Sequence, residues 1–227
     1  RIERDGGVSV QLVDGSTIWL FGDSAERAAD GSFRYFVHNT AAWASADEPT
    51  VTRDGVLSGN SPALFAEAPP GTCDASQFSK AALWPESAVA IPQEDGTDRV
   101  VVFMSKSCLG AGWLDIENVG FAIAEFRYDP ADPPIDRPIR GVVTQPDMWA
   151  SSEGYGRALV LAPDDSLYGY WCGTFPDDWT SCHVARVSVD DEIDPAAWRY
   201  WNGGDWTEAD SWTPVQSDAA AMELPDS

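Results

Sequence analysis

Short runs of alternating apolar and polar residues, separated by Gly, Pro, Asp and Asn, dominate the chain. An alternation with a period of two is typical of β-strands that bury one face, and the turn residues between the runs indicate antiparallel connections. No stretch carries a helical period for more than about two turns. The sequence therefore predicts an all-β protein. The expected strands are residues 8–12, 17–21, 33–43, 82–91, 100–105, 119–128, 157–162, 167–172, 183–189 and 198–201.

These strands repeat as units that begin with a hairpin, and the first hairpins of successive units are about 70 to 80 residues apart. A series of four-stranded antiparallel units is typical of a β-propeller, with a β-sandwich or jelly roll as the alternative. The expected blades cover about residues 5–75, 76–145 and 146–210, and residues 211–227 begin a fourth. Because propellers close with about four to eight blades, we expect a second chain of a processed precursor, or another subunit, to supply the rest.

The charge balance excludes two classes of partner. The 227 residues include 37 acidic and 14 basic side chains, for a formal charge of −23. Nucleic acid and anionic membrane surfaces would be repelled, and no apolar run approaches the roughly 20 residues of a membrane-spanning helix. No apolar leader opens the sequence, so we expect any targeting segment to have been removed. The 11 Trp residues suit a protein that handles carbohydrate.

The four cysteines indicate two disulfides. Cys172 and Cys182 flank a turn-like stretch between strands, which suits a bridge across the ends of a hairpin loop, and Cys73 would then pair with Cys108. Two such pairs are typical of an oxidising, extracytoplasmic compartment; four reduced thiols in a cytosolic protein are the alternative. Zinc is disfavoured because the cysteines form no CxxC pair. We therefore expect a secreted protein without a metal or another cofactor.

Two aspartates flank the first hairpin. If the turn is centred on Asp14, Asp5 and Asp23 lie directly opposite each other on one face, whereas a two-residue turn at Asp14-Gly15 would put them on opposite faces. Paired carboxylates perform glycoside hydrolysis: one protonates the departing oxygen, and the other acts as a nucleophile or as a base on water. The alternative is ordinary turn and loop chemistry at both positions.

The residues from Asp5 to Asp23 (DGGVSVQLVDGSTIWLFGD) resemble the opening blade of glycoside hydrolase family 183, a former domain of unknown function. Residues 38–41 (HNTA), 83–87 (LWPES) and 199–206 (RYWNGGDW) are also similar to that family. The resemblance implies a five-bladed propeller that cleaves internal links of mycobacterial-type D-arabinan, with Asp5 and Asp23 as its carboxylates. We assign Asp23 as nucleophile or base and Asp5 as acid.

Candidate substrate contacts come from the first two units. His38 and Asn39 follow the third expected strand, and the Asn39 amide suits a hydrogen bond to a sugar hydroxyl unless it is an ordinary loop residue. Trp84 and Glu86 open the second unit. An indole ring stacks on the C–H face of a sugar, or else packs between blades, and Glu86 would hold a hydroxyl or alter a neighbouring pKa.

The third unit opens in the same way, with Glu153, Tyr155 and Arg157 as further candidate substrate contacts. The guanidinium of Arg157 is expected to hold a carboxylate in its charged form, and a structural Arg–Glu pair is the alternative.

The sequence thus predicts a secreted endo-acting hydrolase of α-D-arabinofuranosyl links in arabinogalactan or lipoarabinomannan. Its expected partners are the polysaccharide and the chain that completes the propeller. A hydrolase of another furanoside, such as L-arabinan or a fructan, is a close alternative. A carbohydrate-binding propeller without activity and a structural propeller that presents a protein-binding face are alternatives of other classes. Retention or inversion at the anomeric carbon depends on the carboxylate separation, which sequence does not give.

Overall fold

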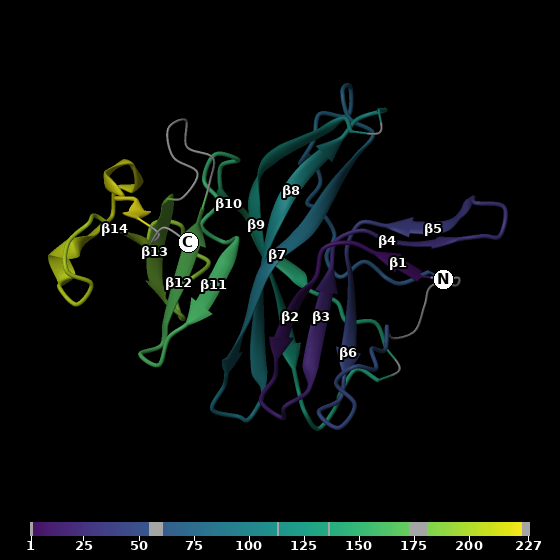
Figure 1. Cartoon of the computed structure of the whole chain (residues 1–227), viewed down its shortest axis with the longest axis horizontal. Helices are drawn as coiled ribbons and strands as arrows, with labels where there is room; N and C mark the ends of the chain where they lie inside the picture. The colour runs from purple at the N-terminus through teal and green to yellow at the C-terminus, as the bar shows by residue number, and fades with distance from the viewer. Residues whose placement is uncertain (1, 55–60, 113, 136, 173–180, 224–227) are drawn as a thin grey trace.

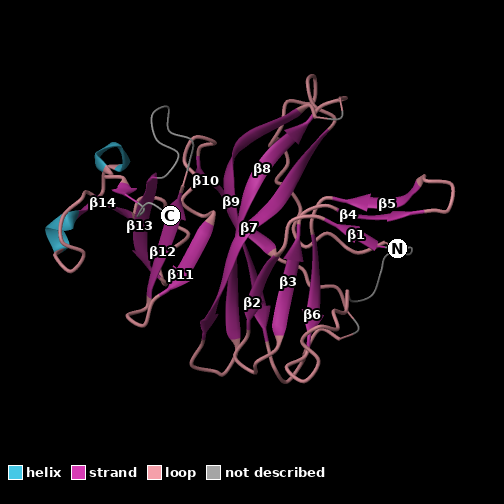
Figure 2. Cartoon of the chain, in the orientation of Figure 1, coloured by secondary structure: helices cyan, strands magenta, loops and turns pink. Residues whose placement is uncertain are grey.

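The computed structural model describes residues 2–54, 61–112, 114–135, 137–172 and 181–223. Within these ranges the fold consists of antiparallel sheets with two short 3-10 turns (Figures 1 and 2), which confirms the all-β prediction. No described helix is long and apolar enough to cross a membrane. The elements are β1 (Ile2–Arg4), β2 (Val8–Gln11), β3 (Thr17–Phe21), β4 (Ser24–Arg27), β5 (Phe33–Val37), β6 (Thr40–Ala44), β7 (Lys80–Pro92), β8 (Asp98–Leu109), β9 (Ile116–Tyr128), β10 (Val142–Trp149), β11 (Ala158–Leu161), β12 (Ser166–Trp171), β13 (Ser181–Ser188), β14 (Arg199–Trp201), η1 (Ala209–Ser211), β15 (Trp212–Thr213), η2 (Gln216–Asp218) and β16 (Met222–Glu223).

The first unit contains two three-stranded sheets, with the orders β2–β3–β6 and β1–β4–β5. The expectation of one strand over residues 33–43 is wrong, because the chain leaves the second sheet at His38 and Asn39 and enters the first, so that β5 and β6 are separate. The β4–β5 hairpin, whose first strand was not expected, extends away from the rest of the molecule (Figure 1).

The first hairpin pairs β2 with β3 in the symmetric register, which is centred on Asp14 and puts Asp5 opposite Asp23. The Leu12 amide donates to the Ser16 carbonyl over 2.9 Å, and the Gly15 amide donates to the Leu12 carbonyl over 2.9 Å. The turn therefore has three residues centred on Asp14, with Gly15 at a φ of 82° that glycine adopts readily. The two-residue alternative is wrong, and the strands pair as a turn centred on Asp14 requires.

The middle sheet, in the order β10–β9–β8–β7, is buried on both faces. Along β8, Val100, Val102 and Met104 pack into one hydrophobic core, whereas Val101 and Phe103 pack into a second. A strand covered on both sides needs a nearly continuous apolar run, which explains the composition of β8. Strand β7 packs against β2 on one side and β11 on the other (Figure 1).

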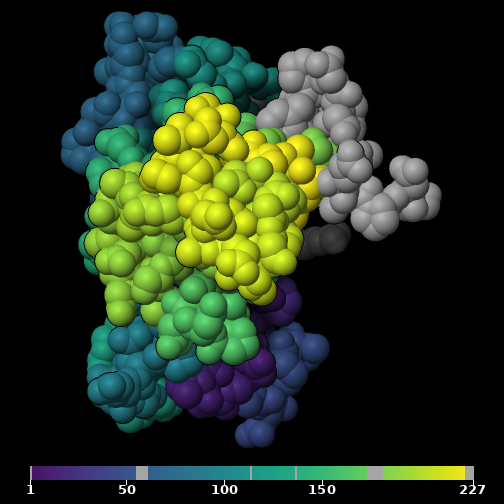
Figure 3. Space-filling model, turned by 90° about the vertical axis from the view of Figure 1, so that its left-hand side faces the viewer, coloured from purple at the N-terminus to yellow at the C-terminus, as the bar shows by residue number. Residues whose placement is uncertain are grey.

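The C-terminal sheet follows the order β11–β12–β13–β14–β15, with β16 paired to β13. Figure 3 views this end of the molecule, where the C-terminal residues lie over the strands of the sheet. Both expected disulfides are present: Cys172–Cys182 lies beside β12 and β13, and Cys73–Cys108 joins the loop before β7 to β8.

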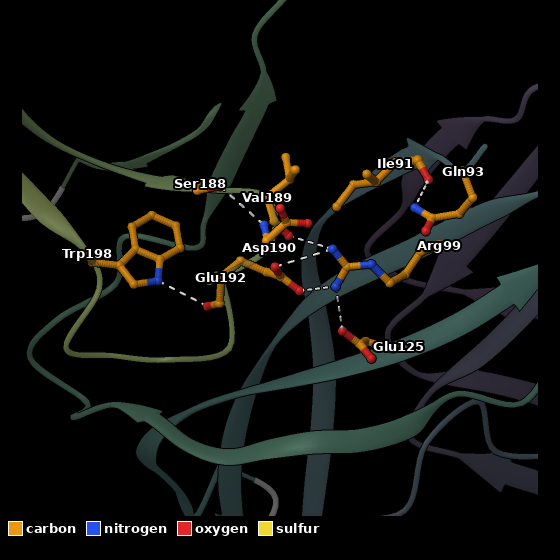
Figure 4. Close-up of polar contacts among 9 residues, drawn as sticks. All are labelled: Ile91, Gln93, Arg99, Glu125, Ser188, Val189, Asp190, Glu192 and Trp198. Carbon is orange, nitrogen blue, oxygen red and sulfur yellow. Dashed lines mark hydrogen bonds and ion pairs between the residues drawn. The ribbon is translucent and has the colours of Figure 1, made fainter. Parts of the chain in front are cut away.

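An arginine joins the middle sheet to the C-terminal sheet (Figure 4). Arg99 of β8 donates to the carboxylate of Glu192, which is fully buried, and to the carbonyl of Val189. The same guanidinium reaches Glu125 of β9 over 3.1 Å, and the backbone of Glu192 accepts a bond from the Trp198 indole over 3.0 Å. Burial raises the pKa of Glu192, and the cation opposes that effect. The negative charge of the buried Glu192 carboxylate therefore depends on the positive charge of Arg99.

Candidate active site

Asp5 and Asp23 face each other where β1 and β4 meet β2 and β3. The Asp5 amide donates to the Asp23 carbonyl over 3.0 Å, and the Gly22 amide donates to the Asp5 carbonyl over 3.0 Å. The carboxylate oxygen Oδ1 of Asp5 accepts the Asp23 amide over 2.7 Å. These bonds place both carboxyl groups at one cleft, as the symmetric hairpin predicts.

Two side chains hold the carboxylate of Asp23. His38 Nδ1 lies 3.0 Å from Asp23 Oδ1, and the Trp84 indole Nε1 donates to the same oxygen over 2.9 Å. An ionised carboxylate only accepts hydrogen bonds, so His38 carries its proton on Nδ1 in this contact. The second oxygen, Oδ2, has no hydrogen-bond partner among the residues that the structure describes. The contacts thus fix the orientation of Asp23 and leave one oxygen available.

The cleft around this pair has a volume of about 410 Å³. Substrate pockets typically measure roughly 300–1,000 Å³, so the space suits a small ligand or one part of a polymer. The lining combines carboxylates and a lysine with aromatic and aliphatic side chains. It consists of Asp5, Asp23, Phe36, His38, Ser79, Lys80, Trp84, Leu109, Gly110, Gly112, Leu114, Asp115 and Ile116.

Asn39 and Glu86 are not among the lining residues. The Asn39 amide is buried and donates to the carbonyls of Ala66 over 3.1 Å and Leu83 over 3.0 Å, while its oxygen accepts the Ala66 amide over 2.9 Å. These three bonds join the loop before β7 to β7 itself, which corresponds to the alternative of a structural asparagine. Glu86 is half-buried at the bulge of β7 beside Pro85.

The candidates of the third unit lie elsewhere. Glu153 and Tyr155 line a second cleft of about 410 Å³ with Trp171 and His183, and that cleft shares no lining residue with the first. Tyr155 is buried, and burial raises the pKa of its hydroxyl. The guanidinium of Arg157 lies 5.9 Å from the ring centre of Phe121. Within this chain, the third-unit residues are therefore separate from the carboxylate pair.

Sequence reasoning missed Phe36, Lys80 and Asp115. Phe36 comes from the β4–β5 hairpin, and its ring lies 5.4 Å from that of His38 in an edge-on arrangement. The Lys80 ammonium is 5.9 Å from the centre of the Phe36 ring. Asp115 belongs to the turn between β8 and β9. Nothing local marks these three residues, because they come from segments that are distant from one another in the sequence.

The described residues contain no group of three or more His, Cys, Asp or Glu side chains that could hold a metal ion. The titratable side chains that line the cleft are three carboxylates (Asp5, Asp23 and Asp115), one imidazole and one ammonium group. Such a set suits proton transfer and nucleophilic attack at a sugar carbon.

Comparison with known proteins identifies one family. A model of the domain of unknown function DUF5005 matches residues 3–224. No curated protein matches the chain. Among solved structures, a crystal structure described as a putative hydrolase from Bacteroides ovatus ATCC 8483 is similar, with a TM-score of 0.60 and 16% sequence identity. The match covers 93% of this chain and 54% of that one, so this chain spans about half the length of its structural relative. At this identity the likeness concerns the fold.

Proposed function

We propose that this chain, which belongs to the DUF5005 family, is part of a secreted endo-acting glycoside hydrolase that cleaves α-D-arabinofuranosyl links of mycobacterial-type arabinan. The observation that carries the proposal is the pair of opposed aspartates at one cleft, with Asp23 held by His38 and Trp84. The similar fold of a protein described as a putative hydrolase agrees with a hydrolytic reaction. The choice of D-arabinan rests on the resemblance to glycoside hydrolase family 183.

In the proposed reaction, Asp5 donates a proton to the glycosidic oxygen as the bond from that oxygen to the anomeric carbon breaks. Asp23 either attacks the anomeric carbon, to form an ester that water later hydrolyses, or removes a proton from the attacking water. The N–H groups of His38 and Trp84 at Asp23 Oδ1 favour the negatively charged form of this carboxylate. Its other oxygen, Oδ2, is then available to attack the anomeric carbon or to take the proton from water. The net change is the addition of water across one glycosidic bond, which requires no cofactor.

His38 and Trp84 line the cleft, where they were expected to contact the substrate, and both also hydrogen-bond Asp23. We assign them as positioning residues, because each fixes the orientation of the carboxylate. Trp84 also lines the cleft, so its ring remains available to a sugar face.

The packing of the sheets supports a propeller that other blades complete. Strands β2, β7 and β11 are each the first strand of their sheet along the chain and lie at its edge. Strand β7 packs against both of the others. First strands that adjoin one another around a common centre are the arrangement of propeller blades. We propose that a second chain supplies the remaining blades. The two disulfides and the proposed cell-wall substrate support a location outside the cytoplasm.

Product analysis tests the activity. The native protein, isolated with any chain that copurifies, is incubated with mycobacterial D-arabinan and separately with plant L-arabinan. We expect oligosaccharides from D-arabinan, and a loss of at least about 1,000-fold in Asp23→Asn, because an essential carboxylate is gone. Asp47→Asn, at an exposed position, is the matched control and should retain activity.

Three other outcomes would contradict parts of the proposal. Oligosaccharides released from L-arabinan would show that the substrate is not the proposed D-arabinan. Binding of D-arabinan without cleavage would indicate a carbohydrate-binding propeller. An active protein of the mass of this single chain would contradict the two-chain arrangement.

A further inference from the structure

One face of the β1–β4–β5 sheet carries a row of side chains that continues from the carboxylate pair. Alternation along β4 puts Ala25 and Arg27 on the same face as Asp23. Across the ladder, Phe36 pairs with Ala25 and Phe33 pairs with Arg27. The row therefore leads from Asp23 outward along the hairpin.

This row forms a second depression, which we call the outer arm. It has a volume of about 210 Å³ and is lined by Glu3, Arg4, Asp5, Asp23, Ala25, Arg27, Phe33 and Phe36. Three of these residues, Asp5, Asp23 and Phe36, also line the larger cleft. The two spaces are therefore neighbours, and both border the carboxylate pair.

The chemistry of the outer arm suits a sugar ring. Phe33 is 45% exposed, and the Arg27 guanidinium lies 4.1 Å from the centre of its ring. Arg27 also pairs with Glu3 over 3.1 Å, and both side chains are about half exposed. A furanose presents C–H groups that pack on an aromatic ring, and hydroxyl groups that exchange hydrogen bonds with a guanidinium and a carboxylate. Ala25, between this group and the aspartates, is small enough to leave the path open.

We propose that the outer arm binds a further sugar unit of the polysaccharide, on the opposite side of the cleaved bond from the larger cleft. Phe33 and Arg27 are then residues that determine how long a substrate must be for efficient cleavage. This inference rests on the proposed function, since it takes the aspartates as the point of cleavage. The β4–β5 hairpin thereby acquires a role in selecting polymer over short oligosaccharides.

The test uses Phe33→Ala and Arg27→Met, with Arg34→Met as the matched control. Arg34 also lies on the hairpin and pairs with Glu26 over 2.8 Å, on the face away from the outer arm. The measurements are kcat/KM on arabino-oligosaccharides of increasing length, and calorimetric binding of the longest one to Asp23→Asn proteins that carry each change. We expect each variant to lose about tenfold in kcat/KM and in affinity, confined to oligosaccharides long enough to reach the outer arm.

The outcomes separate the two proposals. If the unaltered protein cleaves the oligosaccharides and both variants match Arg34→Met at every length, the outer arm is refuted and the hydrolase stands. If the protein binds the oligosaccharide without cleaving it, the hydrolase is refuted, and the affinities of the variants still decide the outer arm. Neither cleavage nor binding would overturn both.

Discussion

A methyl group at Gly22 should displace the carboxylate of Asp5. The Cβ of Gly22→Ala would lie 2.9 Å from Asp5 Oδ1 and 3.3 Å from the Asp5 carbonyl oxygen. Since non-bonded carbon contacts are optimal at about 3.5–4.0 Å, the carboxylate must move by several tenths of an ångström to about 1 Å. Displacements of that size at a reacting group cost up to about 100-fold in rate. We expect kcat to fall by about 10- to 100-fold, which is about 1.4 to 2.7 kcal/mol of lost transition-state stabilisation.

The same substitution should change stability little. The closest contact is with the end of an exposed side chain, and the Asp5 carbonyl oxygen needs to shift by only a few tenths of an ångström. Alanine also restricts the unfolded chain, so we expect the free energy of unfolding to change by less than about 1 kcal/mol. Gly7→Ala is the matched control, because its Cβ would meet no atom within 4 Å. Steady-state kinetics on a substrate that the unaltered protein cleaves, with urea unfolding alongside, measures both quantities. A Gly22→Ala protein as active as Gly7→Ala would refute the idea that the position of Asp5 matters for catalysis.

Three further predictions concern stability, each read by denaturant unfolding. Arg99→Met leaves the buried Glu192 carboxylate without its cation and should cost about 3–5 kcal/mol; a loss under about 1 kcal/mol would show that the sheets are not joined there. Burial raises the pKa of Asp98, so its ionisation opposes folding as the pH rises through that pKa. Asp98→Asn should therefore be more stable than the unaltered protein at neutral pH, and a gain that persists below the ordinary aspartate pKa would contradict this cause. Replacing Cys73 and Cys108 by serine opens a loop with a sequence separation of 35, which should lower the free energy of unfolding by about 4 kcal/mol in the chain-entropy model. An unchanged midpoint of denaturant unfolding would contradict this stabilising role of the disulfide.

Local sequence predicted the first hairpin, because turn chemistry at Asp14 and Gly15 acts within a few residues. It left two registers open, and only one of them puts Asp5 opposite Asp23. The hydrogen bonds of the turn in the structure selected that register. The disulfide pairing was predictable for a related reason, because a hairpin brings the ends of its own loop together.

The parts that sequence reasoning missed depend on contacts between distant segments. Trp84 reaches Asp23 from another sheet, and no local pattern distinguishes an indole that stacks on sugar from one that donates a hydrogen bond. The β4 strand, with the polar sequence SAER, lacks the apolar alternation that identifies a half-buried strand. No glycine or proline marks the boundary at His38 and Asn39 where the chain changes sheets. Recognition of the β4–β5 hairpin, and of Phe36 in the cleft, therefore required the structure.

The positions of the candidate catalytic residues follow from the seam between the two small sheets of the first unit. The chain crosses this seam three times, and Asp5, Asp23 and His38 each lie at one of the crossings. Directly opposed residues of neighbouring strands share a face, and Asp5 and Asp23 keep the register of the ladders on either side of the seam. His38 reaches Asp23 from the third crossing, while hairpins on both sides hold the backbones. A site at the seam is thus held rigidly by two sheets, and the outer arm follows directly from the second of them.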